Sequence, residues 1–358
     1  MHDLPMPAVS PGILLEALWT GGAAWVLALA FAARARASRL LDVPDARKQH
    51  AAPVPRVGGI AVAGALLAGA LMLFAGGPLA WPWAPYLALA AGAFAIGLAD
   101  DLGRLQTRDK LAWQVVLSGL AGAVLAWRGD GVGAFGAITF GWLSPLMTAL
   151  WVFAVLTVVN FIDGIDGITA CVVVVMLGIG FGCGAGPGNG TLYLLAAAAV
   201  CGTAFWNVTP ARVFLGDSGT HLLGFLVATL PMTVRAAPEA VASVPWAYAA
   251  APLMPCVLDV GWGIVSKIRH GVPIHAAHSD HVYQRITKAG TSHLGSAVRY
   301  GVLTVIGAAL VRWSGDLGFE ATVAVAAVVL LLHFGQAAVA TRGVPHEFGG
   351  AEAPAGRP

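Results

Sequence analysis

Carboxylates in glycine-punctuated segments are the residues of this chain whose types and spacing are best suited to chemistry. Asp163 and Asp166 lie three residues apart in NFIDGIDGI, where glycine lets the backbone approach a ligand closely. Asp217 lies in the Gly-Asp-Ser-Gly turn of VFLGDSGTHLLGF, and Asp100 and Asp101 are adjacent in GLADDLGRL. Carboxylate oxygens are the ligands that Mg²⁺ prefers, so these segments predict a divalent-metal site.

Each acidic residue also has an ordinary structural explanation, because Asp or Ser before a helix is a common N-cap. For Asp217 or Asp163 taken alone, a helix cap explains the residue as well as chemistry does. Independent helix caps would not explain why three acidic clusters lie on the same predicted face as most of the basic residues. We therefore predict that the acidic clusters act together.

Two basic segments accompany the acids. The first is DVPDARKQHAAPVPRVGGI, which ends at a glycine-led helix start, and the second is a loop region with half of the 10 histidines. Their candidate anion-binding residues are Lys48, His50, Arg56, His278, His281 and Arg285. Histidine with arginine and without cysteine favours anions over zinc, for which a lone H-x-x-H spacing is weak support. Positive-inside anchoring also explains the first segment, but it leaves the histidines unexplained.

The elements that must position these residues are transmembrane helices. Of the 358 residues, 58% are apolar and 11% are charged, and the mean hydropathy is +0.78. A soluble domain carries about 25% charged residues. The composition therefore excludes a soluble enzyme, a disordered chain and a nucleic-acid-binding domain. The four cysteines form no C-x-x-C pair and indicate neither a zinc site nor a disulfide framework.

We predict an all-α polytopic integral membrane protein with about eleven (10–11) spans of roughly 20 apolar residues each. The predicted spans are 13–33, 58–75, 84–99, 111–127, 143–160, 168–183, 191–207, 218–235, 246–265, 296–313 and 319–340. We expect residues 1–341 to form a single transmembrane helical domain with cytoplasmic catalytic loops, and residues 342–358 to form a flexible cytoplasmic tail.

The distribution of Lys and Arg predicts the orientation. Seventeen of the 20 fall in the tail or in the connections after odd-numbered spans, and only Arg128, Arg235 and Arg312 fall on the other side. By the positive-inside rule, the N-terminus is periplasmic and the C-terminus is cytoplasmic. The acidic clusters and both basic segments then share the cytoplasmic face.

Acids for a divalent metal and cations for phosphates, side by side at a membrane surface, predict phosphoryl transfer between a soluble nucleotide and a membrane lipid. Catalysis of this kind depends mainly on positioning and on neutralising charge. Asp259 is the one carboxylate well inside a predicted span, and we expect it to support helix packing or the loop that follows.

In this order, the segments resemble those of the polyprenyl-phosphate N-acetylhexosamine-1-phosphate transferases, the undecaprenyl-phosphate glycosyl-1-phosphate transferases of glycosyltransferase family 4. The match runs from Asp42 to Arg285 through DVPDARKQH, PRVGGI, GLADDLGRL, NFIDGIDGI, PARVFLGDSGTHLLGF, the stretch from Pro255 to Asp259, and HSDHVYQRI. Each segment alone is weakly specific, whereas the segments together, in this order and on one predicted face, are very specific.

The resemblance implies an enzyme of the bacterial inner membrane with its active site on the cytoplasmic face. Such an enzyme transfers an N-acetylhexosamine-1-phosphate, or its 6-deoxy counterpart, from a UDP-sugar to undecaprenyl phosphate and releases UMP. The implied cofactor is Mg²⁺, with Mn²⁺ as the alternative. The implied role is the first membrane step of a cell-surface polysaccharide such as O-antigen. The implied partners are the two substrates and membrane lipid, without nucleic acid, and the resemblance allows for a homodimer.

Carried over by position, the resemblance also implies roles for the acidic residues. Asp217 would be the principal metal ligand, joined by Asp163. Asp100 and Asp101 match the paired catalytic acids, and Asp100 would keep the lipid phosphate deprotonated while Lys110 holds that phosphate.

The same resemblance implies a set of substrate-binding positions. They are Lys48, His50, Arg56, Lys110, Asn160, Asp166, His278, His281 and Arg285. Among them, Asn160 would contact the nucleotide or the metal, and the histidine-rich loop would bind the sugar diphosphate.

Two of the segments depart from the usual family pattern. The paired acids lack the third carboxylate of a DDxxD motif, because Arg104 stands at that position. The histidine loop reads HVYQR instead of H-x-H-H-R, a form that looks like the O-antigen-initiating branch, which handles 6-deoxy sugars.

Two other functions are weighed against this one. A CDP-alcohol phosphotransferase needs an Ala-Arg after its first Asp-Gly, and DGIDGIT offers none. A lipid-linked glycan transporter would place polar groups along the bilayer midplane, often in repeated halves. Here the acids gather at one face and no repeat is evident.

Overall fold

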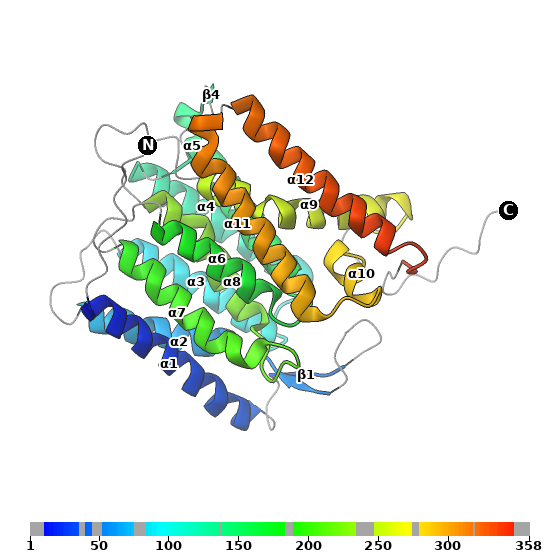
Figure 1. Ribbon diagram of the computed structural model, residues 1–358. Coiled ribbons are helices and arrows are strands. Elements are labelled where there is room, and N and C mark those ends of the chain that lie inside the picture. The colour runs from blue at the N-terminus through cyan, green and yellow to red at the C-terminus, as the bar shows by residue number, and fades with distance from the viewer. Residues whose placement is uncertain are drawn as a thin grey trace.

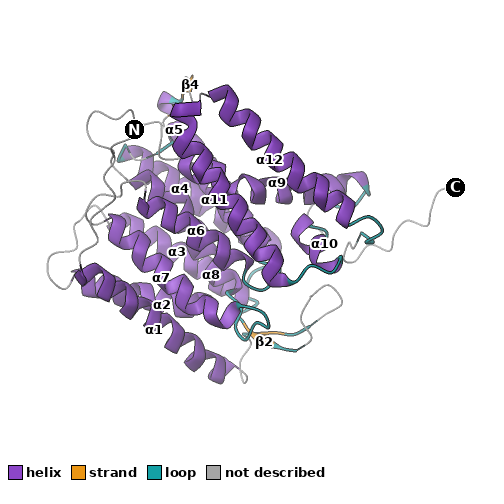
Figure 2. Ribbon diagram, viewed as in Figure 1, coloured by secondary structure: helices purple, strands orange, loops and turns teal. Residues whose placement is uncertain are grey.

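The computed structural model describes residues 11–35, 40–44, 52–74, 84–129, 131–132, 134–135, 138–182, 189–233, 247–273, 279–317 and 319–346. Within these ranges the chain forms twelve α-helices, most of them in one bundle, and two short pairs of strands (Figures 1 and 2). The all-α architecture predicted from the sequence is confirmed.

Eleven helices form the bundle, and α10 is a short helix in the loop after α9. The first six are α1 (Pro11–Ala35), α2 (Gly58–Phe74), α3 (Ala84–Asp101), α4 (Thr107–Trp127), α5 (Ser144–Ile162) and α6 (Ile168–Gly182). The others are α7 (Asn189–Asn207), α8 (Gly216–Thr233), α9 (Ala247–Arg269), α10 (Val282–Lys288), α11 (His293–Leu317) and α12 (Phe319–Ala340). A turn of 3₁₀ helix, Gly141–Leu143, precedes α5.

The strands make two small antiparallel pairs. In the first pair, β1 (Leu41–Asp42) lies beside β2 (Val54–Pro55), with Leu41 opposite Pro55. In the second pair, β3 (Ala134–Phe135) lies beside β4 (Ile138–Thr139). Both pairs lie in connections between bundle helices.

Each of the eleven predicted spans falls on one bundle helix. Six described helices are long and apolar enough to cross a membrane: Pro11–Arg34, Thr107–Trp127, Gly141–Ile162, Ala250–Arg269, His293–Leu310 and Val323–Ala340. Shorter apolar helices are Gly58–Met72, Ile168–Gly180 and Thr191–Asn207. The polytopic membrane fold is confirmed, while the number of spans and their orientation stay predictions.

Helix α8 is the central element of the half of the bundle that carries the acidic residues. It packs on α3, α5 and α2. Leu223 and Phe225 of α8 are fully buried and belong to the same apolar core as Val155 and Val159 of α5. In a membrane, such contacts depend on close packing rather than on hydrophobic burial from water.

Glycines fix the N-terminus of α8 between α2 and α3. A Cβ on Gly97 of α3 would collide with the carbonyl of Asp217, and a Cβ on Gly59 of α2 would collide with the backbone of Gly219. The first two N–H groups of α2 also donate to carbonyls of the segment just before α8, at 2.9 and 2.8 Å. The first turn of α8 is therefore held on two sides by backbone.

Candidate active site

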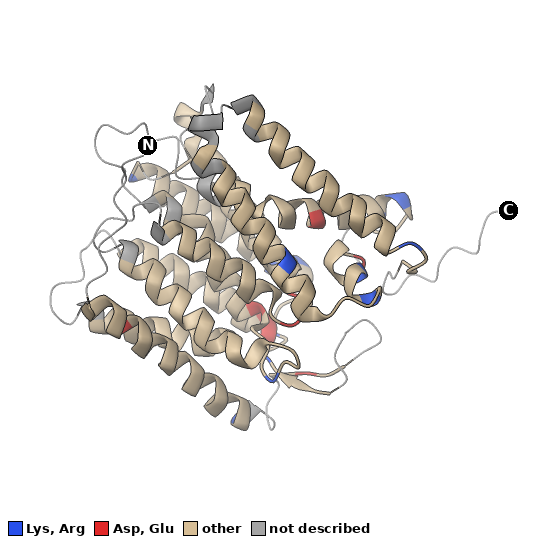
Figure 3. Ribbon diagram, in the orientation of Figure 1, with Lys and Arg blue, Asp and Glu red and all other residues tan. Residues whose placement is uncertain are grey.

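The charged residues of the bundle gather at one end. Figure 3 shows that most of the described Lys, Arg, Asp and Glu residues lie toward the helix ends beside β1 and β2 and around α10. At this end the N-terminus of α8 meets the C-terminal ends of α3 and α5 and the N-terminal end of α4.

Asp217 in the first turn of α8 is the centre of this arrangement. Its carboxylate accepts a hydrogen bond from Lys110 Nζ of α4, and its Oδ1 accepts one from Asn160 Nδ2 of α5 at 3.0 Å. Lys110 Nζ also donates to Asp100 Oδ2 at the end of α3, at 2.9 Å. One ammonium group thus lies between two half-buried carboxylates, and carboxylate oxygens gathered in this way suit a further cation.

Asp101 has a different position from its neighbour Asp100. It is 5% exposed, and its two oxygens accept the backbone N–H groups of Asp217 and Ser218 at 2.9 and 2.8 Å. The first N–H groups of a helix lack partners within the helix, and the N-terminus carries partial positive charge. Asp101 therefore caps α8 from outside and positions Asp217.

Asp163 follows α5 directly, and α10 holds its loop. The hydroxyl of Tyr283 in α10 donates to the carbonyl of Phe161 at 2.9 Å. A Cβ on Gly164 would collide with that hydroxyl, so only glycine fits there. Burial, with the negative charge of Asp217, raises the pKa of Asp163 to about 7. A bound cation relieves this kind of repulsion.

Asp166 ties the same loop to two other segments. Its carboxylate accepts the N–H of Ala211 at 3.1 Å and lies 3.4 Å from Nδ1 of His293 at the start of α11. Burial would raise the pKa of Asp166, but these contacts hold it below its usual value. Asp166 thus joins the loop after α5 to the turn before α8.

His281 belongs to a separate polar cluster around Asp259. Asp259 is fully buried in α9, and its carboxylate accepts the N–H groups of Val282 and Tyr283 at 2.8 and 3.0 Å. It also contacts His281 Nδ1 at 3.2 Å and accepts the hydroxyl hydrogen of Tyr300. Asp259 therefore caps α10, in agreement with the expectation that it supports the loop after α9.

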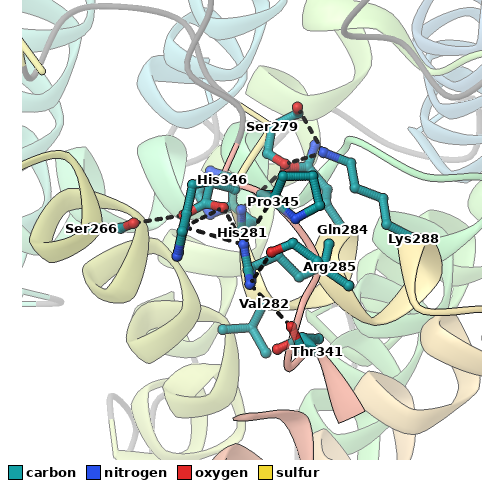
Figure 4. Close-up of polar contacts among 12 residues, drawn as sticks. Ser266, Ser279, His281, Val282, Gln284, Arg285, Lys288, Thr341, Pro345 and His346 are labelled. Atoms are coloured by element: carbon teal, nitrogen blue, oxygen red, sulfur yellow. Dashed lines mark hydrogen bonds and ion pairs between the residues drawn. The ribbon is translucent and has the colours of Figure 1, made fainter. Parts of the chain in front are cut away.

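Arg285 is 7% exposed and joins α10 to the segment after α12 (Figure 4). Its guanidinium donates to Asp280 Oδ1 at 2.8 Å and to the carbonyls of Val344 and Thr341 at 2.9 and 3.3 Å. These partners accept hydrogen bonds from several of the N–H groups of the guanidinium. The predicted contact of Arg285 with a sugar diphosphate stays untested.

Asp280 collects three donors in that cluster. Ser266 donates to its Oδ2 at 2.6 Å, His346 Nδ1 lies 2.8 Å away, and Arg285 completes the set. Burial would raise the pKa of Asp280, but the hydrogen bonds from Ser266, His346 and Arg285 hold it below its usual value. The carboxylate is therefore ionised at neutral pH.

Of the remaining residues singled out from the sequence, Arg56 and Arg104 lie within the described ranges. Arg56 forms an ion pair with Asp42 of β1. Arg104 is exposed in the turn after α3. Lys48, His50 and His278 lie outside the described residues.

The structure thus brings together one part of the predicted site. The residues joined directly are Asp100, Asp101, Lys110, Asn160 and Asp217. Asp163 is close enough for its charge to couple to Asp217. Within the described ranges, no three His, Cys, Asp or Glu side chains could hold a metal by themselves.

Two residues beside Asp217 were not foreseen from the sequence. Gln114 Nε2 of α4 lies 2.7 Å from His221 Nε2 of α8, and His221 Nδ1 lies 2.8 Å from the carbonyl of Asp217. Gln114 and His221 lie four residues after Lys110 and Asp217, the spacing that places two side chains on one helix face. That spacing is the signal that could have found them.

Comparison with known proteins places the chain in a family. The profile of glycosyl transferase family 4 matches residues 83–235, which contain α3 to α8. The chain is 33% identical over 226 residues to the phospho-N-acetylmuramoyl-pentapeptide-transferase of Moorella thermoacetica, covering 58% of this chain and 70% of the relative. The chain belongs to glycosyl transferase family 4. The resemblance to the polyprenyl-phosphate N-acetylhexosamine-1-phosphate transferases is confirmed.

Other relatives in family 4 cover more of the chain. It is 30% identical over 317 residues to a putative glycosyltransferase of Streptomyces coelicolor, covering 86% of this chain and 72% of the relative. It is 28% identical over 267 residues to the probable undecaprenyl-phosphate N-acetylglucosaminyl 1-phosphate transferase of Bacillus subtilis, covering 71% of each. The chain is therefore a membrane enzyme, a sugar-1-phosphate transferase.

Proposed function

We propose that this enzyme transfers a sugar-1-phosphate from a UDP-sugar to undecaprenyl phosphate and releases UMP. The observation that carries the proposal is the convergence of Asp217, Asp100, Lys110 and Asn160 from four helices at one end of the bundle. Carboxylates next to an ammonium suit a cation and a phosphate at once. The names of the Bacillus subtilis and Thermotoga maritima relatives, both undecaprenyl-phosphate N-acetylglucosaminyl 1-phosphate transferases, support the same reaction.

The proposed cofactor is Mg²⁺, with Mn²⁺ as a substitute, held by Asp217 with Asp163. The residues fit such an ion because their donors are carboxylate oxygens, and because Mg²⁺ commonly takes only one or two protein carboxylates with substrate phosphates. Burial, and to a smaller extent the charge of Asp217, raises the pKa of Asp163, and a cation beside this carboxylate would favour its ionised form. When bound, the ion would polarise the diphosphate and neutralise charge on the departing nucleotide.

The side chains of the site then have definite tasks. An oxygen of the lipid phosphate attacks the β-phosphorus of the UDP-sugar, and the bond from that phosphorus to the oxygen of UMP breaks. A phosphate monoester is largely a dianion above its second pKa near 6, so the attack needs little help from a base. Lys110 would attract the acceptor phosphate, Asn160 would hold the Asp217 carboxylate, and Asp100 would orient Lys110.

The orientation in the membrane follows from the charge distribution. We infer that the N-terminus is periplasmic and that the site faces the cytoplasm, where nucleotide sugars are available. Within the proposed reaction, Arg56, Asp166, His281 and Arg285 line or support the substrate-binding side of the site.

For the sugar, we propose an N-acetylhexosamine. The names of several relatives favour N-acetylglucosamine. The HVYQR form of the loop favours a 6-deoxy-N-acetylhexosamine and, with it, an O-antigen-like product. A transfer assay with a panel of UDP-sugars distinguishes these two possibilities.

The test uses purified protein, undecaprenyl phosphate, Mg²⁺ and a panel of UDP-N-acetyl sugars labelled at the β-phosphate. We expect label in the lipid and UMP in solution with one sugar, and neither product with Asp217→Asn, which should still fold and insert. UMP release without label in lipid would contradict the proposed reaction. Retention of most activity by Asp217→Asn would contradict the role of Asp217.

A further inference from the structure

Two helices of the site are joined by a buried side-chain pair. Gln114 of α4 is 5% exposed and His221 of α8 is fully buried, and their side-chain nitrogens lie 2.7 Å apart. Among the described residues, the backbones of α4 and α8 make at most isolated contacts, because each helix packs on α3 and α5. The long side chains of α4 therefore make the connection between the two helices.

The hydrogen-bond chemistry of this pair has one consistent arrangement. An amide nitrogen only donates, so Gln114 Nε2 donates to Nε2 of His221. The ring proton of the neutral imidazole is then on Nδ1, which donates to the carbonyl of Asp217 at 2.8 Å. Gln114 is thus linked through one imidazole to the backbone of the central acid.

The pair repeats the contact one turn away. On α4, Lys110 and Gln114 are four residues apart, and on α8, Asp217 and His221 have the same spacing. Residues at this spacing lie one above the other on a helix face. Lys110 contacts Asp217, and Gln114 contacts His221. The second contact therefore fixes the position of α4 along the axis of α8, in the register that brings Lys110 to Asp217.

We propose that Gln114 and His221 are positioning residues, which act together to hold the Lys110 ammonium between Asp100 and Asp217. This inference rests on the proposed function of the acidic cluster. Among the described residues, neither side chain hydrogen-bonds to the ammonium of Lys110 or to the carboxylates of Asp100 and Asp217. Their effect is on the distance between a cation and two carboxylates, and a displacement of about 1 Å at such a place can cost a hundredfold in rate.

The experiment is a double-mutant cycle with Gln114→Leu, His221→Leu and the double variant in the full-length protein. Each single change leaves a buried polar partner unsatisfied. We expect each to lower kcat roughly tenfold to a hundredfold with little change in the KM for the UDP-sugar. The double variant should be no worse than either single one. The exchanged variant Gln114→His/His221→Gln should recover most of the lost kcat.

The matched control is Ser118→Ala. Ser118 lies one turn beyond Gln114 on α4 and is also buried, but its hydroxyl has no hydrogen-bond partner among the described residues. We expect this variant to keep the wild-type kcat. Additive losses in the cycle, an exchanged variant no better than the single ones, or an equal loss in Ser118→Ala would overturn the proposal. If the Leu variants do not fold, Gln114→Asn is used instead. Its side chain is shorter by one methylene, so its amide lies farther from His221, and its kcat is compared with that of Ser118→Ala.

A second readout separates this proposal from the proposed function. Binding of Mn²⁺ alone to the purified protein is followed by electron paramagnetic resonance, without either substrate. The single variants should weaken the Asp217-dependent binding, and the exchanged variant should restore it. Wild-type protein that binds Mn²⁺ but transfers no sugar phosphate would contradict the proposed function, and the positioning role would then be judged from the Mn²⁺ affinities of the same four proteins. Unchanged Mn²⁺ affinity with unchanged kcat would overturn the positioning role.

Discussion

The position of Asp101 leads to a prediction that distinguishes a residue that positions Asp217 from one that contacts the reacting groups. Its two oxygens accept the N–H groups of Asp217 and Ser218. Asp101→Asn keeps one oxygen acceptor and turns an NH₂ group toward the other N–H. The change therefore removes one hydrogen bond to a charged group, worth about 1.5–3 kcal/mol, and the negative charge at the helix N-terminus, worth about 0.3–2 kcal/mol.

These two contributions overlap, so we expect a loss of about 2–4 kcal/mol in the stability of the first turn of α8. Because that turn carries Asp217, kcat should fall with it, by roughly tenfold to a hundredfold. The apparent Tm should fall by several degrees. The assay compares the rate of UMP release and the apparent Tm for wild type, Asp101→Asn and Asp217→Asn.

The comparison with Asp217→Asn is decisive. Asp217→Asn should lose all turnover but lower the apparent Tm less than Asp101→Asn does, because Asp101 still accepts both N–H groups of the first turn of α8 in that variant. If Asp101→Asn loses turnover to the same degree at an unchanged Tm, Asp101 contacts the reacting groups and the capping argument is wrong. If neither turnover nor Tm changes, the two hydrogen bonds contribute nothing measurable.

Three further outcomes are expected. Lys110→Met removes the cation between Asp100 and Asp217, so kcat at saturating Mg²⁺ should fall by about 10²–10³-fold; more than a tenth of the activity would contradict this. Because the pKa of Asp163 is raised to about 7, protons compete with Mg²⁺ below that pH, and the apparent Mg²⁺ affinity should weaken about tenfold per pH unit there; Asp163→Asn should abolish the dependence. The pKa of Asp280 is depressed in the folded state, so its stabilisation is present above its unfolded pKa of about 3.9 and lost as the pH falls through the folded value. The apparent Tm should therefore drop in acid for the wild type and change less for Asp280→Asn.

Hydropathy and charge predict the helices well because both are properties of a single segment. A run such as 144–162 is mostly apolar, and lipid requires every backbone group in it to be paired within the helix. The eleven predicted spans accordingly fall on eleven helices. The same reasoning predicts that Asp217 and Asp100 share one end of the bundle, which the structure shows through their common contact with Lys110.

Contacts between distant segments could not be predicted in this way. Lys110 and Asp217 are 107 residues apart, so no local pattern states that one ammonium lies between Asp217 and Asp100. Asp100 and Asp101 look alike in sequence, but successive residues of a helix point in directions about 100° apart. One of them therefore faces Lys110 and the other faces the backbone of α8.

The contacts of the loop after α9 could not be predicted from the sequence either. A run with His281 and Arg285 indicates anion binding, because residue type is what a sequence displays. The carbonyl partners of Arg285 come from a segment 56 to 60 residues later in the chain, after two more helices. The sequence offers no signal that this arginine is engaged by backbone carbonyls.

That long-range contact has a consequence for the order in which the protein matures. Arg285 and Asp280 find their partners Thr341, Val344 and His346 only after α11 and α12 have been synthesised and inserted. During translation the loop 279–288 leaves the ribosome with a guanidinium and a carboxylate that still lack these partners. We therefore expect the polypeptide to become a competent enzyme only at the end of biogenesis, so that nascent chains halted before α12 do not consume nucleotide sugar.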